Sequence, residues 1–313
     1  MTELAGGIRR ATFAMPLGLD HVHCYLLPSE SDGWTVVDTG LGLPDAGANW
    51  ARTLDELEGP VERIVVTHFH PDHVGAAADL AALTGAAVLQ GSDDYAQCLR
   101  TWGEQRDQEL MPSYLRLHGT PEREVDGFRD EAAAFIQLVR FARDPEPLDV
   151  GDRVDGWEVL HLPGHADGHR ALLRDGVLVA GDTLLGAITP NIGLYPASRP
   201  DPLGDFLASL EQIIALAPRL ALPGHGDLID DPVGRARELI VHHERRLEQT
   251  AAALDGRPQT AYEVSLTLFP DELSTVLRRF ALAETRAHLE YLVHRDGARR
   301  VDEAERVSYL SRG

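Results

Sequence analysis

Three histidines and one aspartate crowd into residues 67–73, and this cluster constrains the chain more than any other feature. The segment reads Thr-His-Phe-His-Pro-Asp-His and follows the apolar residues 64–66, whose β-branched side chains predict a buried strand. Neutral imidazoles are costly to gather unless a cation organises them, and imidazole together with carboxylate suits zinc and similar metals. The cluster therefore predicts a metal site at the end of a strand.

Four further short motifs place a histidine or an aspartate directly after an apolar stretch. They are Val-Val-Asp-Thr-Gly around Asp38, Leu-Pro-Gly-His at His165, Ala-Gly-Asp-Thr around Asp182 and Leu-Pro-Gly-His-Gly around His225. With the His-x-His-x-Asp-His segment, these motifs resemble the signature of the metallo-β-lactamase superfamily, in order, over about residues 10–230. The resemblance implies an α/β fold, an αββα sandwich with its site at one edge of two sheets.

The resemblance also implies a two-metal site. His68, His70 and His165 would hold the first metal, Asp72, His73 and His225 the second, and Asp182 would bridge the two. Zinc is the expected metal, with manganese or iron as alternatives. Two metals about 3.5–4 Å apart supply a bridging hydroxide near neutral pH. Asp72 is the expected catalytic residue, because it would orient this hydroxide.

The remaining candidate residues are expected to be structural. Asp38 is expected to orient a ligand or its loop, and His169 is expected to be structural. Cys24 and Cys98 lie outside any Cys-x-x-Cys pair and are expected to be buried thiols. A structural role is also expected for His21, His23, His118, His161, His242, His243, His288 and His294.

Hydrophobic patterning divides the first 230 residues into strands and helices. Strands are predicted at 8–14, 22–27, 34–37, 63–67, 157–162, 171–173, 177–180 and 220–222. Helices are predicted at 74–83, ended by Gly85, and at 203–217. Between them, residues 93–143 have helical spacing and predict a helical insertion. This insertion either lines a substrate cleft or only packs on the domain.

The last quarter of the chain is predicted to be helical. One helix is expected at 232–254, and we predict a catalytic domain at 1–241 and a smaller one at 242–313. Helices at 260–269, 271–280 and 283–294, with a ribbon at 298–301 and 306–310, resemble the winged helix of the β-lactamase-like protein 2 and glyoxalase II branch. Its expected apolar core is Leu266, Leu268, Leu273, Val276, Leu277, Leu289 and Leu292.

Charge and hydropathy restrict the partners. The formal net charge is −21, which argues against general nucleic-acid binding. Residues 242–313 carry only −1, but Arg299 and Arg300 are balanced by neighbouring acidic residues, so packing or a homodimer is favoured over nucleic-acid binding there. We find no apolar run long enough for a membrane span and no secretory signal, so a soluble cytoplasmic protein is expected.

Several substrate classes agree with such a metal site. We favour hydrolysis of a small carboxylic ester or thioester, with a phosphodiesterase or endoribonuclease acting on single-stranded RNA as the second hypothesis. Quorum-signal lactonases of this superfamily carry a tyrosine three residues after the bridging aspartate, where this chain has Leu185, and this lowers the lactonase hypothesis. A binding module stabilised by metal is the remaining alternative.

Overall fold

Two β-sheets packed face to face form the centre of the molecule. The computed structural model describes residues 1–17, 19–270 and 272–312. Within them, the first sheet contains β1 (Thr2–Glu3), β2 (Arg9–Leu17), β3 (Leu19–Pro28), β4 (Trp34–Val37), β5 (Val61–Val66), β6 (Ala87–Gln90) and β7 (Glu146–Pro147), in that order. The second sheet runs β12 (Leu220–Pro223), β11 (Val177–Gly181), β10 (Arg170–Arg174), β9 (Trp157–His161) and β8 (Arg153–Val154).

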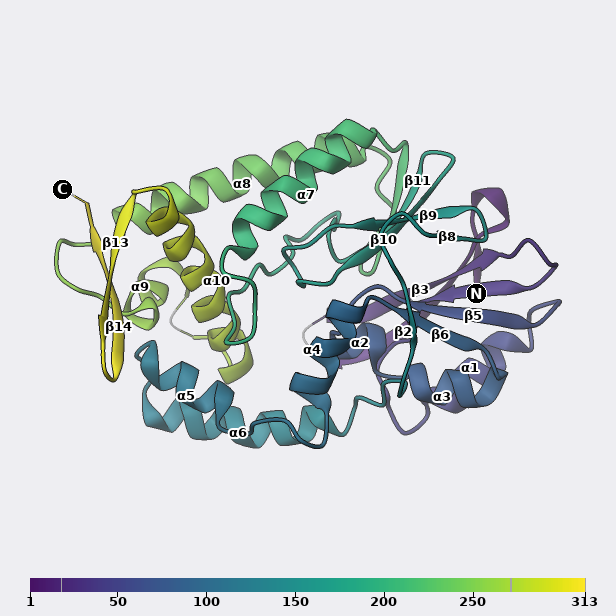
Figure 1. Cartoon of the computed structure of the whole chain (residues 1–313), viewed down its shortest axis with the longest axis horizontal. Coiled ribbons are helices and arrows are strands. Elements are labelled where there is room, and N and C mark those ends of the chain that lie inside the picture. Colours follow the sequence, from purple (N-terminus) through teal and green to yellow (C-terminus); the bar gives the residue numbers. More distant parts are fainter. Residues whose placement is uncertain (18, 271, 313) are drawn as a thin grey trace.

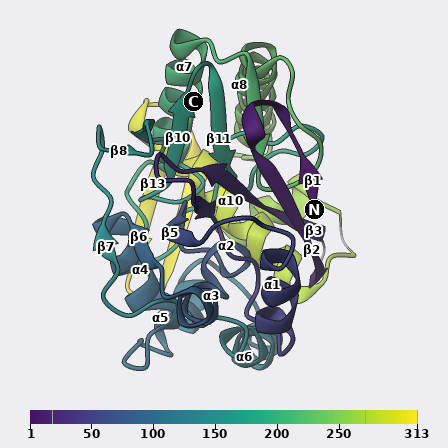
Figure 2. The same ribbon diagram turned by 90° about the vertical axis from the view of Figure 1, so that its right-hand side faces the viewer.

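Helices cover the outer face of each sheet. On β5, Ile64 and Val66 pack against α1 (Ala46–Leu54) and α3 (Ala77–Thr84), while Val65 points to the second sheet. The helices α7 (Pro202–Leu216) and α8 (Pro232–Ala252) cover the other sheet. Figures 1 and 2 show the four layers. The expected αββα sandwich is therefore confirmed.

The expected helical insertion consists of α4 (Ser92–Trp102), α5 (Leu110–Leu117) and α6 (Glu122–Ile136). The insertion packs against the C-terminal unit, by which we mean α9 (Ala261–Leu268), α10 (Thr275–His294) and the hairpin of β13 (Ala298–Glu303) and β14 (Arg306–Ser311). Tyr114, Leu115 and Val125 of the insertion share one core with Leu282 and Tyr309 of this unit. These apolar side chains of the insertion therefore pack on the C-terminal unit (Figure 1).

The C-terminal unit differs from the sequence prediction in two respects. The helices expected at 271–280 and 283–294 are one continuous helix, α10, because residues 281–283 contain no glycine or proline and are buried. Asp271, the first residue of the former, lies outside the described residues. Leu266 and Leu277, expected in the core, are 41% and 48% exposed. Ala261, Val264 and Leu282 are buried there instead.

Other local predictions have mixed outcomes. The helix expected at 74–83 is interrupted into α2 (Pro71–Val74) and α3, and Gly85 ends α3 with the expected left-handed φ of 73°. Cys24 and Cys98 are buried free thiols, as expected. The helix α8 continues without a break through position 241, where we predicted a domain boundary. In the described part of the chain, none of the helices combines the length and the apolar character of a membrane span.

Candidate metal centre

The predicted site residues come together at one edge of the two sheets. Each motif follows the carboxyl end of a strand, and the strands concerned are β4, β5, β9, β11 and β12. The pairs β4 with β5 and β11 with β12 are parallel, so their carboxyl ends lie at the same edge. The fold thereby gathers all seven predicted ligands into two adjoining clusters.

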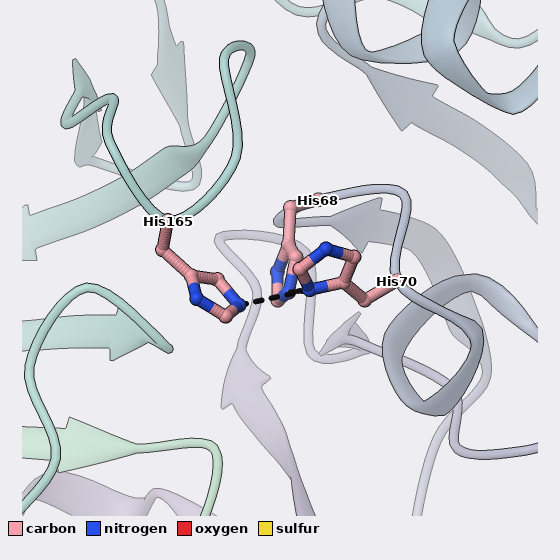
Figure 3. Close-up of side chains that lie close together, drawn as sticks. All are labelled: His68, His70 and His165. Carbon is pink, nitrogen blue, oxygen red and sulfur yellow. Dashed lines mark hydrogen bonds between the residues drawn. The ribbon is translucent and has the colours of Figure 1, made fainter. Parts of the chain in front are cut away.

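The first cluster contains His68, His70 and His165. His70 Nδ1 lies 3.0 Å from His68 Nε2 and 2.8 Å from His165 Nε2. Figure 3 shows the loop of His165 approaching from one side and the loop of His68 and His70 from the other. The three nitrogens thus face one common point.

In His68 and His165, a hydrogen bond to Nδ1 on the far side of the ring fixes the tautomer. The Nε2 atom of each ring then presents its lone pair to this point. The Thr67 hydroxyl donates to Asp38 Oδ2 and lies 3.0 Å from His68 Nδ1, which therefore donates to it. His165 Nδ1 donates to the carbonyl of Asn191 at 3.0 Å. The Nε2 atoms of His68 and His165 are then both acceptors. A proton on His70 Nδ1 could serve only one of them at a time. A cation fits this donor set.

Burial keeps the first cluster neutral. Burial and the neighbouring imidazole of His73 hold the pKa of His68 well below its usual value. Burial and His165 lower the pKa of His70 to about 3. Neutral imidazole is the form that binds a metal.

The second cluster contains Asp72, His73, Asp182 and His225. His225 Nε2 lies 3.1 Å from Asp72 Oδ2 and 3.3 Å from Asp182 Oδ2. His73 Nε2 lies 3.4 Å from Asp182 Oδ1. Asp182 Oδ2 is also 3.6 Å from His165 Nε2, so this carboxylate lies between the two clusters.

Three atoms of the second cluster are buried without a hydrogen-bond partner among the described residues. They are His73 Nε2, His225 Nε2 and Asp182 Oδ1. An unsatisfied buried polar atom costs about 1–3 kcal/mol. A divalent cation between these atoms would remove that cost, so the residues present fit a metal.

Asp38 holds the second cluster in place from behind. Its Oδ2 accepts from His73 Nδ1 at 2.8 Å, and its Oδ1 accepts from the backbone N–H of Thr67 at 2.8 Å. Asp38 has a φ of 64°, a strained backbone conformation for a residue other than glycine. These contacts agree with the expectation that Asp38 orients a ligand and its loop.

Two glycines are required for different reasons. Gly164 has a φ of 127°, which favours glycine and turns the chain into His165. Gly224 is not among the positive-φ residues, but a Cβ there would lie 2.3 Å from Asp182 Oδ1. Gly224 therefore allows the loop of His225 to approach the bridging position.

His169 has the structural role that we expected. Its Nε2 accepts from the backbone N–H of Asp182 at 3.2 Å, and its Nδ1 lies 3.2 Å from Thr183 Oγ1. Both ring nitrogens are thus engaged in holding the loop of Asp182.

His21 and His23 contribute to the site more than the sequence prediction allowed. His225 Nδ1 donates to the His21 carbonyl at 2.7 Å, His21 Nε2 accepts from the Gly226 N–H at 3.1 Å, and His23 Nε2 contacts the Gly226 carbonyl at 2.8 Å. Their spacing of two puts both side chains on one face of β3. That spacing was the available signal that they act together.

The sequence pattern described as "Metallo-beta-lactamase superfamily" matches residues 17–225, which is most of the chain. The chain belongs to the metallo-β-lactamase superfamily. A second pattern, described as "Metallo-beta-lactamase-like, C-terminal domain", matches residues 247–312. The expected enzyme class, a metal-dependent hydrolase of this superfamily, is confirmed.

Relatives and solved structures agree with this assignment. The chain is 28% identical to "Probable metallo-hydrolase YqjP" of Bacillus subtilis over 88% of this chain and 89% of that protein. It is 26% identical to "Beta-lactamase-like protein 2 homolog" of Drosophila melanogaster over 82% of this chain and 77% of that protein. A metallo-beta-lactamase family protein of Thermus thermophilus is 39% identical, with a TM-score of 0.84 over 98% of this chain and 99% of that one.

Proposed function

We propose that the chain is a dinuclear hydrolase that cleaves a small carboxylic ester or thioester. The observation that carries the proposal is the convergence of seven ligand residues in two adjoining clusters, with three buried atoms of the second cluster lacking a partner among the described residues. We assign His68, His70 and His165 to one metal, Asp72, His73 and His225 to the other, and Asp182 to both. Zinc suits these donors, with manganese or iron as alternatives.

Each residue then has a chemical task. When bound, the two metals supply a hydroxide nucleophile near neutral pH and polarise the oxygen of the scissile group. Asp72 would orient that nucleophile and take up the proton that a water loses when it becomes hydroxide. Its side chain is the more accessible of the two carboxylates, at 14% exposed against 8% for Asp182. Burial raises the pKa of Asp72, but the imidazoles of His73 and His225 outweigh it and bring the pKa to about 2, so Asp72 is ionised.

One relative supports the choice of an ester or thioester, and the hairpin of β13 and β14 disfavours the RNA alternative. The chain is 25% identical to the "Atrochrysone carboxyl ACP thioesterase" of Claviceps purpurea over 74% of this chain and 60% of that protein. In the hairpin, Arg300 already bonds Glu290 at 2.9 Å and Asp302 at 2.8 Å. An arginine held by two carboxylates is a poor phosphate ligand, which disfavours the RNA hypothesis.

Activity profiling tests the proposal. Zinc-, manganese- and iron-loaded protein would be assayed with acyl thioesters, acyl esters, homoserine lactones and single-stranded RNA. We expect turnover of a thioester or ester at least tenfold above that of lactone, because Leu185 is buried and has no hydroxyl group to offer. RNA cleavage that depends on Arg299 and Arg300, without ester turnover, would replace the proposal by the second hypothesis.

A further inference from the structure

The segment of residues 191–195 lies between the first cluster and the C-terminal unit. On one side, the Asn191 carbonyl accepts the hydrogen bond from His165 Nδ1. That bond fixes the tautomer of His165, so its Nε2 presents a lone pair toward His70. The orientation of a single backbone carbonyl therefore determines how His165 faces the candidate metal position.

On its other side, the Asn191 side chain is held by α10. Asn191 Nδ2 donates to Glu284 Oε2 at 3.2 Å and to the Phe280 carbonyl at 3.5 Å, while Asn191 Oδ1 accepts from the Tyr195 hydroxyl at 3.3 Å. Glu284 is a partly covered carboxylate with a side chain 14% exposed, and its other oxygen lies 3.8 Å from Arg246 Nε. Both polar ends of the Asn191 amide are thus engaged.

The end of the segment is attached to the same helix and to the insertion. The Leu194 N–H donates to the Ala283 carbonyl at 3.0 Å. The Leu194 carbonyl accepts from the Tyr114 hydroxyl at 2.7 Å and from Arg286 at 3.4 Å. Ile192, between these contacts, is buried in the core beneath α7. The core fixes where the segment lies, and α10 fixes how its peptide groups are turned.

We propose that Glu284 is a positioning residue for the metal ligand His165. Through the Asn191 amide it fixes the carbonyl that holds His165 Nδ1, so the C-terminal unit sets the geometry of the first cluster. This inference rests on the proposed metal centre. The sequence does not predict the contact, because His165 and Glu284 are far apart in the chain and several strands and helices lie between them.

The experiment uses the full-length protein with Co²⁺ as the probe, because its d–d absorption reports ligand geometry. Groups that orient a metal ligand are worth about 10- to 100-fold in metal affinity. We expect Glu284→Ala to weaken Co²⁺ binding by about that factor and to change the absorption bands. Glu284→Gln keeps an oxygen that accepts from Asn191 Nδ2, so we expect it to restore most of the affinity and the wild-type spectrum.

Glu290→Ala is the matched control. Glu290 is a buried carboxylate on the same helix, 6% exposed, and it accepts from the Tyr309 hydroxyl at 2.7 Å and from Arg300 at 2.9 Å. Its loss should lower the Tm at least as much as Glu284→Ala does, yet leave Co²⁺ affinity and spectrum unchanged. Wild-type affinity and spectrum in Glu284→Ala would overturn the proposal, as would equal metal effects in both variants.

Two further results keep the test decisive. Where Glu284→Ala does not fold, Asn191→Asp replaces the donor facing Glu284 with an acceptor, and we expect the same spectral change; an unchanged spectrum would overturn the proposal. Wild-type protein that binds no Co²⁺ would refute the metal centre itself, and with it this inference. Normal wild-type binding with unaltered variants would refute only the role of Glu284.

Discussion

Two groups of buried histidines in this molecule, one at the metal centre and one between α8 and α10, make different contacts. At the metal centre, His68, His73 and His225 each use Nδ1 for an orienting hydrogen bond, and their Nε2 atoms face other ligand atoms. In the core between α8 and α10, His243 Nδ1 donates to His288 Nε2 at 3.1 Å, and His288 Nδ1 donates to the Glu284 carbonyl. Burial is common to both regions. Convergence of lone pairs and carboxylates distinguishes the metal centre.

The largest effect on metal content is expected for Asp182→Ala. Asp182 lies between the clusters, so its removal takes a ligand from both metals and leaves the buried imidazoles of the second cluster without this carboxylate. We expect the metal content after dialysis to fall from near two ions per chain to below one, and turnover to disappear. Elemental analysis checks this. Retention of two ions would show that the clusters bind independently of Asp182.

Asp72→Ala is expected to affect only the second cluster. The first cluster keeps all its ligands, so about one metal ion should remain, while turnover falls by about 10²- to 10⁴-fold with loss of the base. The Tm of the metal-free protein should change less than the turnover, because the Asp72 carboxylate lies beside the candidate ligands His225 and His73, at 3.1 and 3.7 Å, and not in a hydrophobic cluster. Steady-state assays and elemental analysis on one preparation measure both. Near-normal turnover would remove Asp72 from the catalytic role.

Asp38→Asn is expected to weaken the second metal by about 10- to 100-fold. If the asparagine turns its N–H₂ group toward His73, His73 Nδ1 must accept, and the ring proton moves to Nε2, the nitrogen that faces the metal position. In the opposite orientation, the N–H₂ group faces the backbone N–H of Thr67, and two donors meet. Asp155→Asn is the matched control, since Asp155 also has positive φ and a nearly covered carboxylate, bound by Arg63. Metal titration followed by calorimetry should separate the two variants. Equal metal affinities of Asp38→Asn and Asp155→Asn would mean that Asp38 supports the fold and does not orient a metal ligand.

No effect on metal content is expected when His243 and His288 are both replaced by leucine, but the acid stability should change. Burial and the nearby His242 and Arg246 lower the pKa of His243 to about 3 and that of His288 to about 4. The unfolded chain therefore binds more protons, and wild-type stability falls as the pH drops from about 6.5 toward 4.

Between pH 6.5 and 5, the double variant should lose less stability than the wild type, by about 1–2 kcal/mol per histidine. Denaturant unfolding at several pH values measures the difference. Parallel pH profiles for the two proteins would mean that this pair does not titrate on unfolding. A fall in the metal content of the double variant would show that His243 and His288 also support the metal centre, contrary to the comparison drawn above.

The strands and the ligand clusters could be predicted because their signals are local. The run at 64–66 and the motif around Asp182 each combine a buried strand with the polar residue at its end. The short strand β6 and the helix α1 were not predicted, since segments of four and nine residues offer few large apolar positions from which a period can be recognised. Their places are set by packing on β5 and on the core around Trp50.

The contacts that support the ligands could not be read from the sequence in the same way. Asn191 acts through its backbone carbonyl on His165, and any residue type could supply a carbonyl there. Leu266 and Leu277 have the hydrophobic character of core residues, but tertiary packing leaves them at the surface. Local patterns record residue type, whereas these contacts depend on how distant segments meet.

The helix α8 belongs to two hydrophobic cores. Ala236 and Leu239 near its start are buried beneath the second sheet, and Leu254, just beyond its end, is buried with α9 and α10. Its 21 residues span about 30 Å as one rigid rod. Melting either core would expose one end of the same helix, so the catalytic sandwich and the C-terminal unit should unfold in one cooperative transition. Proteolysis would then release no independently stable half.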